Sequence, residues 1–580
     1  MEEIELKFLV PEKRRAAVLA ALQRGQVTQE RLQAHYFDTP DEKLAAHRMA
    51  LRVRKEGLRW VQTFKGATED AMRRIEHNVP VAAPARGVPP TVDLSLHDAG
   101  PAGAALRKAL GAPAASHAGQ SPYQPAPSAG LTCRYSTDIR RISRVVRRGR
   151  SRIELAFDTG WIVAEAERAH VCELEFELVS GSVDDLVAMA AQWMQAHGLA
   201  QSTISKAERG ALLSRSQRHG PPEVAAALRS SRHDTAETVA RRVIASCMRQ
   251  VLSNTSELLA GSDAPEHVHQ ARVGLRRLRT ALGEFGPLLP ALKQATPEVL
   301  GLTFRQLGEV RDRTVVLPQW EETLQSAGAP KEPAPAASSP LQNEAPSTPA
   351  EIVRAMPFQF ALLELMGMLA SPPASTSNAT GAASAASTPE NAGPLNPTNG
   401  TTPIAIAGAP PTAVASSAEA STNLVVAVAP DEPARAYIAR RLQRLHRRIA
   451  RAADRFAELP EAEQHRVRRQ LKRLRYLGDF AAGMFPKPRM RRYLERLKEA
   501  QDALGLHMDQ IVARHAYQQR MGDSPHAAFA VGWLTARGDN TGRRCTKALQ
   551  RIAEATRYWK GGLPARACEH DGKAALTRRG

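Results

Sequence analysis

Cysteine, aromatic residues and long apolar runs are scarce in this chain of 580 residues. The cysteines are Cys133, Cys172, Cys247, Cys545 and Cys568. They are scattered, odd in number and lack CxxC spacing, which argues against a disulfide framework or a zinc site and fits a reducing cytosol. Aromatic residues make up only 5% of the chain, which weakens the case for single-strand binding by base stacking. No apolar run reaches the ~18 residues of a membrane span, and the best candidate, residues 357–370, contains Glu364.

Acidic residues are outnumbered by basic ones. The chain has 79 Lys and Arg against 59 Asp and Glu, a formal charge of +20. This balance favours polyanionic partners, such as nucleic acid, an anionic membrane surface or a phosphate polymer. The N-terminus is charged from residue 2 and shows no apolar segment, so the sequence predicts no secretory signal. The length predicts two or more domains.

Two hydrophobic patterns divide the chain. Residues 1–210 alternate with period two in short stretches separated by turn residues, which predicts an antiparallel barrel or sandwich. From about residue 225 the period changes to 3.6, which predicts long amphipathic helices. The Pro-, Ala- and Gly-rich stretch 81–130 is predicted to be a loop.

A low-complexity stretch interrupts the helical part. Residues 371–430 cannot bury enough apolar surface to order themselves and are predicted to be mostly disordered. The predicted units are a strand-rich domain at 1–210, a linker at 211–224, a first helical half at 225–326, an insertion at 327–432 with a helix at 351–370, a second helical half at 433–565 and a tail at 566–580.

Two copies of one helical pattern flank the insertion. Residues 269–279 align with 465–475, and 307–312 align with 504–509. At about 100° per residue, each copy places a histidine and three cations in one stripe beside an apolar stripe. We call these stripes row 1 (His269, Arg272, Arg276 and Arg279) and row 2 (His465, Arg468, Lys472 and Arg475). Stacked cations repel one another, so their recurrence indicates an external anion; the alternative is a solvated basic face.

Charged residues also recur on single faces of the predicted strands. Alternate side chains of a strand face the same way, so Glu3, Glu5 and Lys7 would stand together. Other such sets are Arg52 with Arg54, Arg74 with Glu76, Glu154 with Asp158, and Glu173 with Glu175 and Glu177, and Lys65 ends a further strand. If the sheet closes, the carboxylates call for Mg²⁺ or Mn²⁺ and the cations call for phosphate. The alternative is a solvated outer face balanced by cross-strand pairs.

The helical part resembles the CHAD family, the conserved-histidine α-helical domain. The motifs that carry the resemblance are HQARVGLRRLR (269–279), LGEVRD (307–312), HRVRRQLKRLRY (465–476), LKEAQDALGLHMD (497–509) and AAFAVGWL (527–534). The resemblance implies two four-helix units that face each other across a basic groove. It also implies that rows 1 and 2 bind inorganic polyphosphate.

The strand-rich part resembles the CYTH superfamily, the triphosphate tunnel metalloenzymes. EIELK (3–7) fits the ExExK signature, and the motifs that follow in order are YFDTP (36–40), LRVR (51–54), TFK (63–65), RIE (74–76), STDIRR (136–141), IELAFDTG (153–160), CELEFEL (172–178) and SKAERG (205–210). The predicted fold class is therefore α+β multidomain: a closed antiparallel β-barrel or tunnel, followed by an all-α duplicated helical bundle with a disordered central insertion.

Carried over by motif, the CYTH resemblance implies roles for residues inside the tunnel. The metal ligands would be Glu3, Glu5, Asp158, Glu173 and Glu175. Phosphate oxygens would be bound by Lys7, Arg52, Arg54, Lys65, Arg74 and Arg141, with Arg140 as a rival to Arg141. Glu154 and Asp158 would hold metal or orient water. The predicted catalytic set is Glu3, Glu5, Lys7, Lys65 and Glu154.

The predicted function is hydrolysis of inorganic triphosphate to pyrophosphate and phosphate with Mg²⁺ or Mn²⁺, while the helical domain binds polyphosphate. One alternative is a polyphosphate-binding module with little or no catalysis. Another is a hydrolase of thiamine triphosphate or a nucleoside triphosphate. Specific nucleic-acid binding rests on charge alone, because no groove-reading or base-stacking motif occurs. We expect a cytoplasmic protein, with polyphosphate granules as one place of association.

Overall fold

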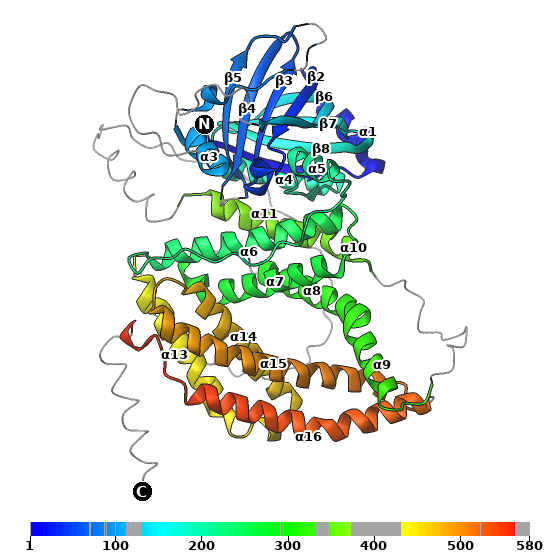
Figure 1. Cartoon of the computed structure of the whole chain (residues 1–580), viewed down its shortest axis with the longest axis vertical. Helices are drawn as coiled ribbons and strands as arrows, with labels where there is room; N and C mark the ends of the chain where they lie inside the picture. The colour runs from blue at the N-terminus through cyan, green and yellow to red at the C-terminus, as the bar shows by residue number, and fades with distance from the viewer. Residues whose placement is uncertain are drawn as a thin grey trace, which may run out of the picture.

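The computed structural model describes residues 2–562, apart from 69–70, 86–87, 89, 99, 112–129, 291, 294, 332–346, 373–430 and 523. The predicted disorder after residue 372 and the predicted tail at 566–580 lie outside the described residues. A barrel at one end of the molecule stands on layers of helices, which extend to the opposite end (Figure 1).

Eight antiparallel strands form a closed barrel, which confirms that part of the predicted fold class. The strand order is β5-β4-β3-β2-β6-β7-β8-β1, and a pairing of β1 with β5 closes the ring. The strands are β1 (Glu2–Leu9), β2 (Thr28–Asp38), β3 (Met49–Glu56), β4 (Arg59–Ala67), β5 (Arg73–Val81), β6 (Thr132–Arg148), β7 (Ser151–Ala164) and β8 (Glu167–Ser180). The two-residue β9 (Ala200–Gln201) pairs with β1 outside the ring.

The alternation along each strand separates an apolar outer face from a charged interior. On β1, Leu6 and Phe8 are buried in the hydrophobic core together with Leu174 and Phe176 of β8. The helix α4 (Val183–His197) covers this face and contributes to the same core. The charged residues between these positions therefore point into the barrel.

Smaller helices complete the barrel domain. They are α1 (Arg15–Leu22), α2 (Lys43–Ala46), α3 (Gly100–Leu110) and α5 (Lys206–Leu213). The prediction of a loop over 81–130 is wrong for α3, which buries Ala102, Leu106 and Ala109 in a core shared with the strands. These three residues are spaced four and three apart, a helical period that the abundance of Ala and Gly masked.

The helical part consists of paired long helices, as predicted. They are α6 (Ala236–Leu259), α7 (Pro265–Phe285), α8 (Ala295–Arg311), α9 (Leu317–Ser326), α13 (Ala434–Ala453), α14 (Glu461–Phe480), α15 (Lys487–Gln518) and α16 (Pro525–Ala553). A buried hub joins the two halves: Glu284 of α7 is paired with Arg441 and Arg444 of α13 and with Arg473 of α14. Among the described residues, no helix has the length and apolarity needed to cross a membrane.

Part of the predicted insertion is folded against both neighbouring regions. The helix α10 (Pro349–Arg354) buries Ile352 and Val353, and the helix α11 (Met356–Ala370) buries Phe358, Leu362 and Leu365. The helix α11 contacts α4 of the barrel domain on one side and α6 and α8 on the other. In Figure 1 this yellow-green helix lies directly under the blue N-terminal barrel, although the two are far apart in the sequence.

Buried and partly buried hydrogen bonds join the barrel domain to the helices. The backbone N–H of Gln201 donates to Oε1 of Gln359 at 2.7 Å, and Nε2 of Gln201 donates to the Gln359 carbonyl at 2.8 Å. The Thr203 N–H donates to the Ser256 hydroxyl at 3.0 Å. Because a single apolar core also runs from β1 and β8 into α6 and α11, these two parts of the chain form one packed body.

Candidate active site

The barrel interior brings the residues of the strand motifs into one electrostatic cluster. Cross-strand register places Lys7 opposite Glu175, and Glu5 opposite Glu177. Ion pairs inside the barrel join Glu5 to Arg74, Lys65 to Glu3 and Glu76, Arg54 to Glu56, and Arg141 to Asp158 and Glu175. The roles proposed for these residues stay predictions, but the fold gathers their side chains.

Arg141, and not Arg140, faces the interior of the barrel. Arg141 Nη2 lies 2.6 Å from Asp158 Oδ2 and 2.5 Å from Glu175 Oε2. Arg140 is exposed and donates to Gln29 Oε1 on the outside of β2. The period-two alternation decides between these two neighbours.

Lys206 lies at the centre of three carboxylates. It is the first residue of α5, and its Nζ lies 2.7 Å from Asp158 Oδ2, 2.8 Å from Glu175 Oε1 and also bonds Glu173. Asp158 and Glu173 are each only 1% exposed, so they need a cation to remain charged. The three carboxylates lie close enough together to hold a metal ion.

The pKa values of this group reflect mutual neutralisation. Burial alone would raise the pKa of Glu175, but Lys206 and Arg141 lower it well below its usual value. Asp158 behaves in the same way, with its pKa lowered by the same two cations against the effect of burial. The pKa of Lys206 is raised well above the usual lysine value by the three carboxylates, again against burial. Asp158 and Glu175 are therefore charged at neutral pH.

A second acidic group in the barrel is less well compensated. Glu154 of β7 and Glu5 of β1 flank Glu177 of β8 in register. Burial first, and then the charges of Glu154 and Glu5, raise the pKa of Glu177 against the lowering effect of Lys65. Burial and the neighbouring Glu76 raise the pKa of Glu3 to about 8, although Lys65 opposes the shift. A divalent cation or a further positively charged side chain near Glu3 and Glu177 would lower both pKa values.

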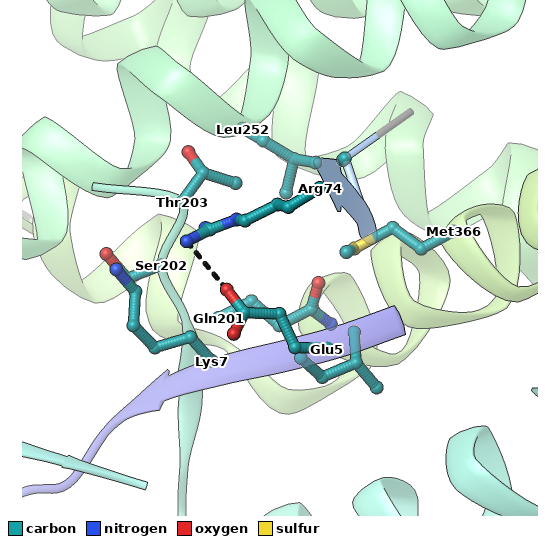
Figure 2. Close-up of a pocket in the computed structure, with 10 residues that line it drawn as sticks. Glu5, Lys7, Arg74, Gln201, Ser202, Thr203, Leu252 and Met366 are labelled. Carbon is teal, nitrogen blue, oxygen red and sulfur yellow. Dashed lines mark ion pairs between the residues drawn. The ribbon is translucent and has the colours of Figure 1, made fainter. Parts of the chain in front are cut away.

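A small cavity beside the Glu5–Arg74 pair is walled by both regions of the chain. Figure 2 shows Arg74 reaching toward Glu5, with a contact of 2.6 Å between Arg74 Nη1 and Glu5 Oε1. Leu252 of α6 and Met366 of α11 line the cavity, together with Thr203. Three predicted site residues, Glu5, Lys7 and Arg74, thus line a cavity that helices outside the barrel domain help to close.

Rows 1 and 2 converge in the helical region. Burial, followed by the positive charges of Arg276 in row 1 and Arg468 in row 2, lowers the pKa of Lys472 to about 6. Burial also lowers the pKa of Arg272 to about 10, followed by the effect of Arg276. The cations of the two rows therefore repel one another across the contact of α7 with α14.

Among the described residues, few carboxylates lie near these cations. Asp509 lies 3.6 Å from Arg468. The negative charge of Asp312 opposes the lowering of the pKa of Arg272. Arg475 Nη1 donates to Gln501 Oε1 at 2.7 Å, and its Nε lies 3.9 Å from Asp479 Oδ2. Both histidines are half-buried beside the arginines of their own row, and burial lowers the pKa of each.

Two family models match the chain: the CYTH domain over residues 1–211 and the CHAD domain over residues 242–518. The chain contains a CYTH domain followed by a CHAD domain. An inorganic triphosphatase of Haemophilus influenzae is 32% identical over 185 residues, which are 31% of this chain and 46% of that protein. The chain thus matches about half the length of this relative.

Solved structures show more distant similarity. The CHAD domain from the plant Ricinus communis is 23% identical, with a TM-score of 0.36, and covers 58% of this chain and 98% of its own. A putative adenylyl cyclase from Hippeastrum, described as having a dominant triphosphatase activity, is 15% identical, with a TM-score of 0.25, and covers 37% of this chain and 96% of its own.

Several charged residues of the CYTH barrel were not among the predicted site residues. Glu76 and Glu177 were recognised only as members of charged strand faces, and Lys206 lay in the SKAERG motif without a role. Lys206 begins a helix, so strand alternation could not place it. Besides the SKAERG motif, its sequence signal is the capping box formed by Ser205 and Glu208, which fixes the helix start beside the barrel.

Proposed function

We propose that the CYTH domain hydrolyses inorganic triphosphate to pyrophosphate and phosphate with the help of a divalent metal ion. The observation that carries this proposal is the position of Lys206 among Asp158, Glu173 and Glu175, inside a barrel that also gathers arginines and lysines. A metal–triphosphate complex needs carboxylates for the metal and cations for the phosphates. The similarity to the Haemophilus influenzae inorganic triphosphatase supports the same activity.

The three carboxylates around Lys206 fit a hard divalent cation. Their oxygens already converge on one positive centre, and carboxylate oxygens are preferred ligands of Mg²⁺ and Mn²⁺. When bound, such an ion would supply positive charge that offsets the negative charge of the phosphate groups. Glu3 and Glu5 on β1 would complete the ligand set.

We propose that Lys206 and Arg141 exchange partners when the substrate binds. In the free barrel, both cations are held by the carboxylates that would ligate the metal. If another cation neutralises those carboxylates, Lys206 and Arg141 are free to turn toward phosphate oxygens. The other cations proposed to bind phosphate are Lys7, Arg52, Arg54, Lys65 and Arg74.

Catalysis would then rest on positioning and electrostatics. A water molecule oriented by Glu154 attacks the terminal phosphorus, one P–O bond forms, and the bond to the leaving pyrophosphate breaks. The cations stabilise the charge that moves onto pyrophosphate. The released proton passes to a carboxylate or to solvent, which balances the reaction.

For the CHAD domain we infer binding of inorganic polyphosphate by rows 1 and 2. The observation behind this second function is the convergence of half-buried cations with few acidic partners, which lowers the pKa of Arg272 and Lys472. A polyanion would relieve this repulsion. If the barrel were inactive, this binding would be the main function, at polyphosphate granules.

One experiment separates these functions. Phosphate release is measured from tripolyphosphate, thiamine triphosphate, ATP and long-chain polyphosphate, each with Mg²⁺, Mn²⁺ or EDTA, and polyphosphate binding is measured on the same preparation. Fast, metal-dependent release from tripolyphosphate supports the proposed reaction. A preference for thiamine triphosphate or ATP would change the substrate, and tight polyphosphate binding without any release would leave only the binding function.

A further inference from the structure

The arginines of row 1 lie on one ring, the side chain of Phe304 on α8. The guanidinium carbons of Arg272, Arg276 and Arg279 lie 4.8, 5.2 and 5.4 Å from its centroid. Arg272 Nη1 also donates to the Phe304 carbonyl at 3.2 Å. An aromatic face attracts guanidinium groups and keeps them stacked over the ring. Their N–H edges stay available to an anion.

Two glycines of α8 leave room for the outer arginines. A Cβ on Gly308 would lie only 2.3 Å from Arg272 Nη1, and a Cβ on Gly301 would lie 3.4 Å from Arg279 Nη2. Gly301, Phe304 and Gly308 occupy one face of α8 at helical spacing, as the three arginines do on α7. We call these three residues the α8 bed.

The second half of the CHAD domain does not repeat this bed. In the alignment of 307–312 with 504–509, the positions of Gly301, Phe304 and Gly308 correspond to Lys498, Gln501 and Gly505. A Cβ on Gly505 would meet nothing within 4 Å. Within the described part of the chain, no cation of row 2 stacks on an aromatic ring, so the repeated sequence carries two unlike rows.

We propose that the α8 bed positions row 1 as the anchoring subsite for a polyphosphate chain, and that row 2 is the weaker subsite. This inference rests on the proposed polyphosphate binding by the CHAD domain. Holding three guanidinium groups in place before binding reduces the conformational entropy lost when phosphates dock. Gly301, Phe304 and Gly308 are positioning residues, because they act through the arginines.

A matched pair of glycine substitutions tests the proposal. In Gly308→Ala the new methyl group displaces the flexible end of Arg272, whereas in Gly505→Ala, at the equivalent place in the repeat, it enters open space. Both changes raise helix propensity to the same extent. We expect Gly308→Ala to weaken polyphosphate binding about fivefold to tenfold and Gly505→Ala to leave it unchanged, with tripolyphosphate hydrolysis the same in both.

Substitutions of Phe304 supply the second measurement. Phe304→Leu keeps an apolar side chain without the aromatic face, and Phe304→Tyr restores that face, so only the leucine variant should bind polyphosphate more weakly. Equal affinity of wild type, Gly308→Ala and Phe304→Leu would overturn the bed while leaving polyphosphate binding intact. Equal losses in Phe304→Leu and Phe304→Tyr would also overturn it, since packing alone would then explain the effect. A wild-type protein that binds no polyphosphate would overturn both proposals.

Discussion

Replacing Lys206 by methionine removes the cation shared by three carboxylates. Two of them, Asp158 and Glu173, are 1% exposed, and Lys206 itself is 13% exposed. Removing one partner of a buried ion pair typically costs about 3–5 kcal/mol. Arg141 stays bonded to Asp158 and Glu175, so we expect a loss near the lower end, about 3 kcal/mol in the free energy of unfolding.

The pH dependence of this loss follows from the pKa shifts. Lys206 helps to hold the pKa of Asp158 and Glu175 below their usual values. The stabilisation is present above the pKa of the unfolded chain and is lost as pH falls through the lower folded pKa. The difference in stability between wild type and Lys206→Met should therefore be full at pH 7 and shrink as the pH falls below about 4.

Urea unfolding with EDTA, and again with Mg²⁺ or Mn²⁺, measures this effect independently of activity. If the three carboxylates form the metal site, metal should stabilise Lys206→Met more than it stabilises wild type, because the competing ammonium group is gone. The control is Lys13→Met, the same change at an exposed lysine. A Lys206→Met protein that is as stable as wild type, or that gains nothing from metal, would refute the reasoning.

Three further predictions follow from other residues. In Glu5→Gln the partner of Arg74 loses its charge, and tripolyphosphate hydrolysis should fall by about 100-fold or more while the protein stays folded. Near-normal turnover of the folded variant would contradict the role of Glu5. Because the pKa of Glu3 is raised to about 8, its proton is bound more tightly in the folded state, and metal-free stability should fall as pH rises from about 5 to 8; Glu3→Gln should lose this slope in pH-dependent unfolding. Glu284→Ala leaves three arginines of α13 and α14 without their shared carboxylate, which is 1% exposed. The free energy of unfolding should fall by about 3–5 kcal/mol, and an unchanged midpoint in urea would contradict this.

Period-two alternation was enough to predict the charged interior of the barrel. The acids and bases of β1, β7 and β8 fall on alternate positions, so once the sheet closes they must share a face. The same local argument, at a period of 3.6, predicted the two cationic rows on α7 and α14. Both predictions depend only on the geometry of one element.

Only the tertiary structure decided which charges meet and which helices enclose them. Lys206 reaches the three carboxylates because α5 docks against β6, β7 and β8, and no local period encodes that docking. In the same way, α11 lies under the barrel although it falls within a stretch predicted to be an insertion. Phe304 meets row 1 through the contact of α7 with α8, and Gln501 takes its place in the repeat. Sequence periodicity determines the face on which a side chain lies, whereas its partners depend on packing between segments that are distant along the chain.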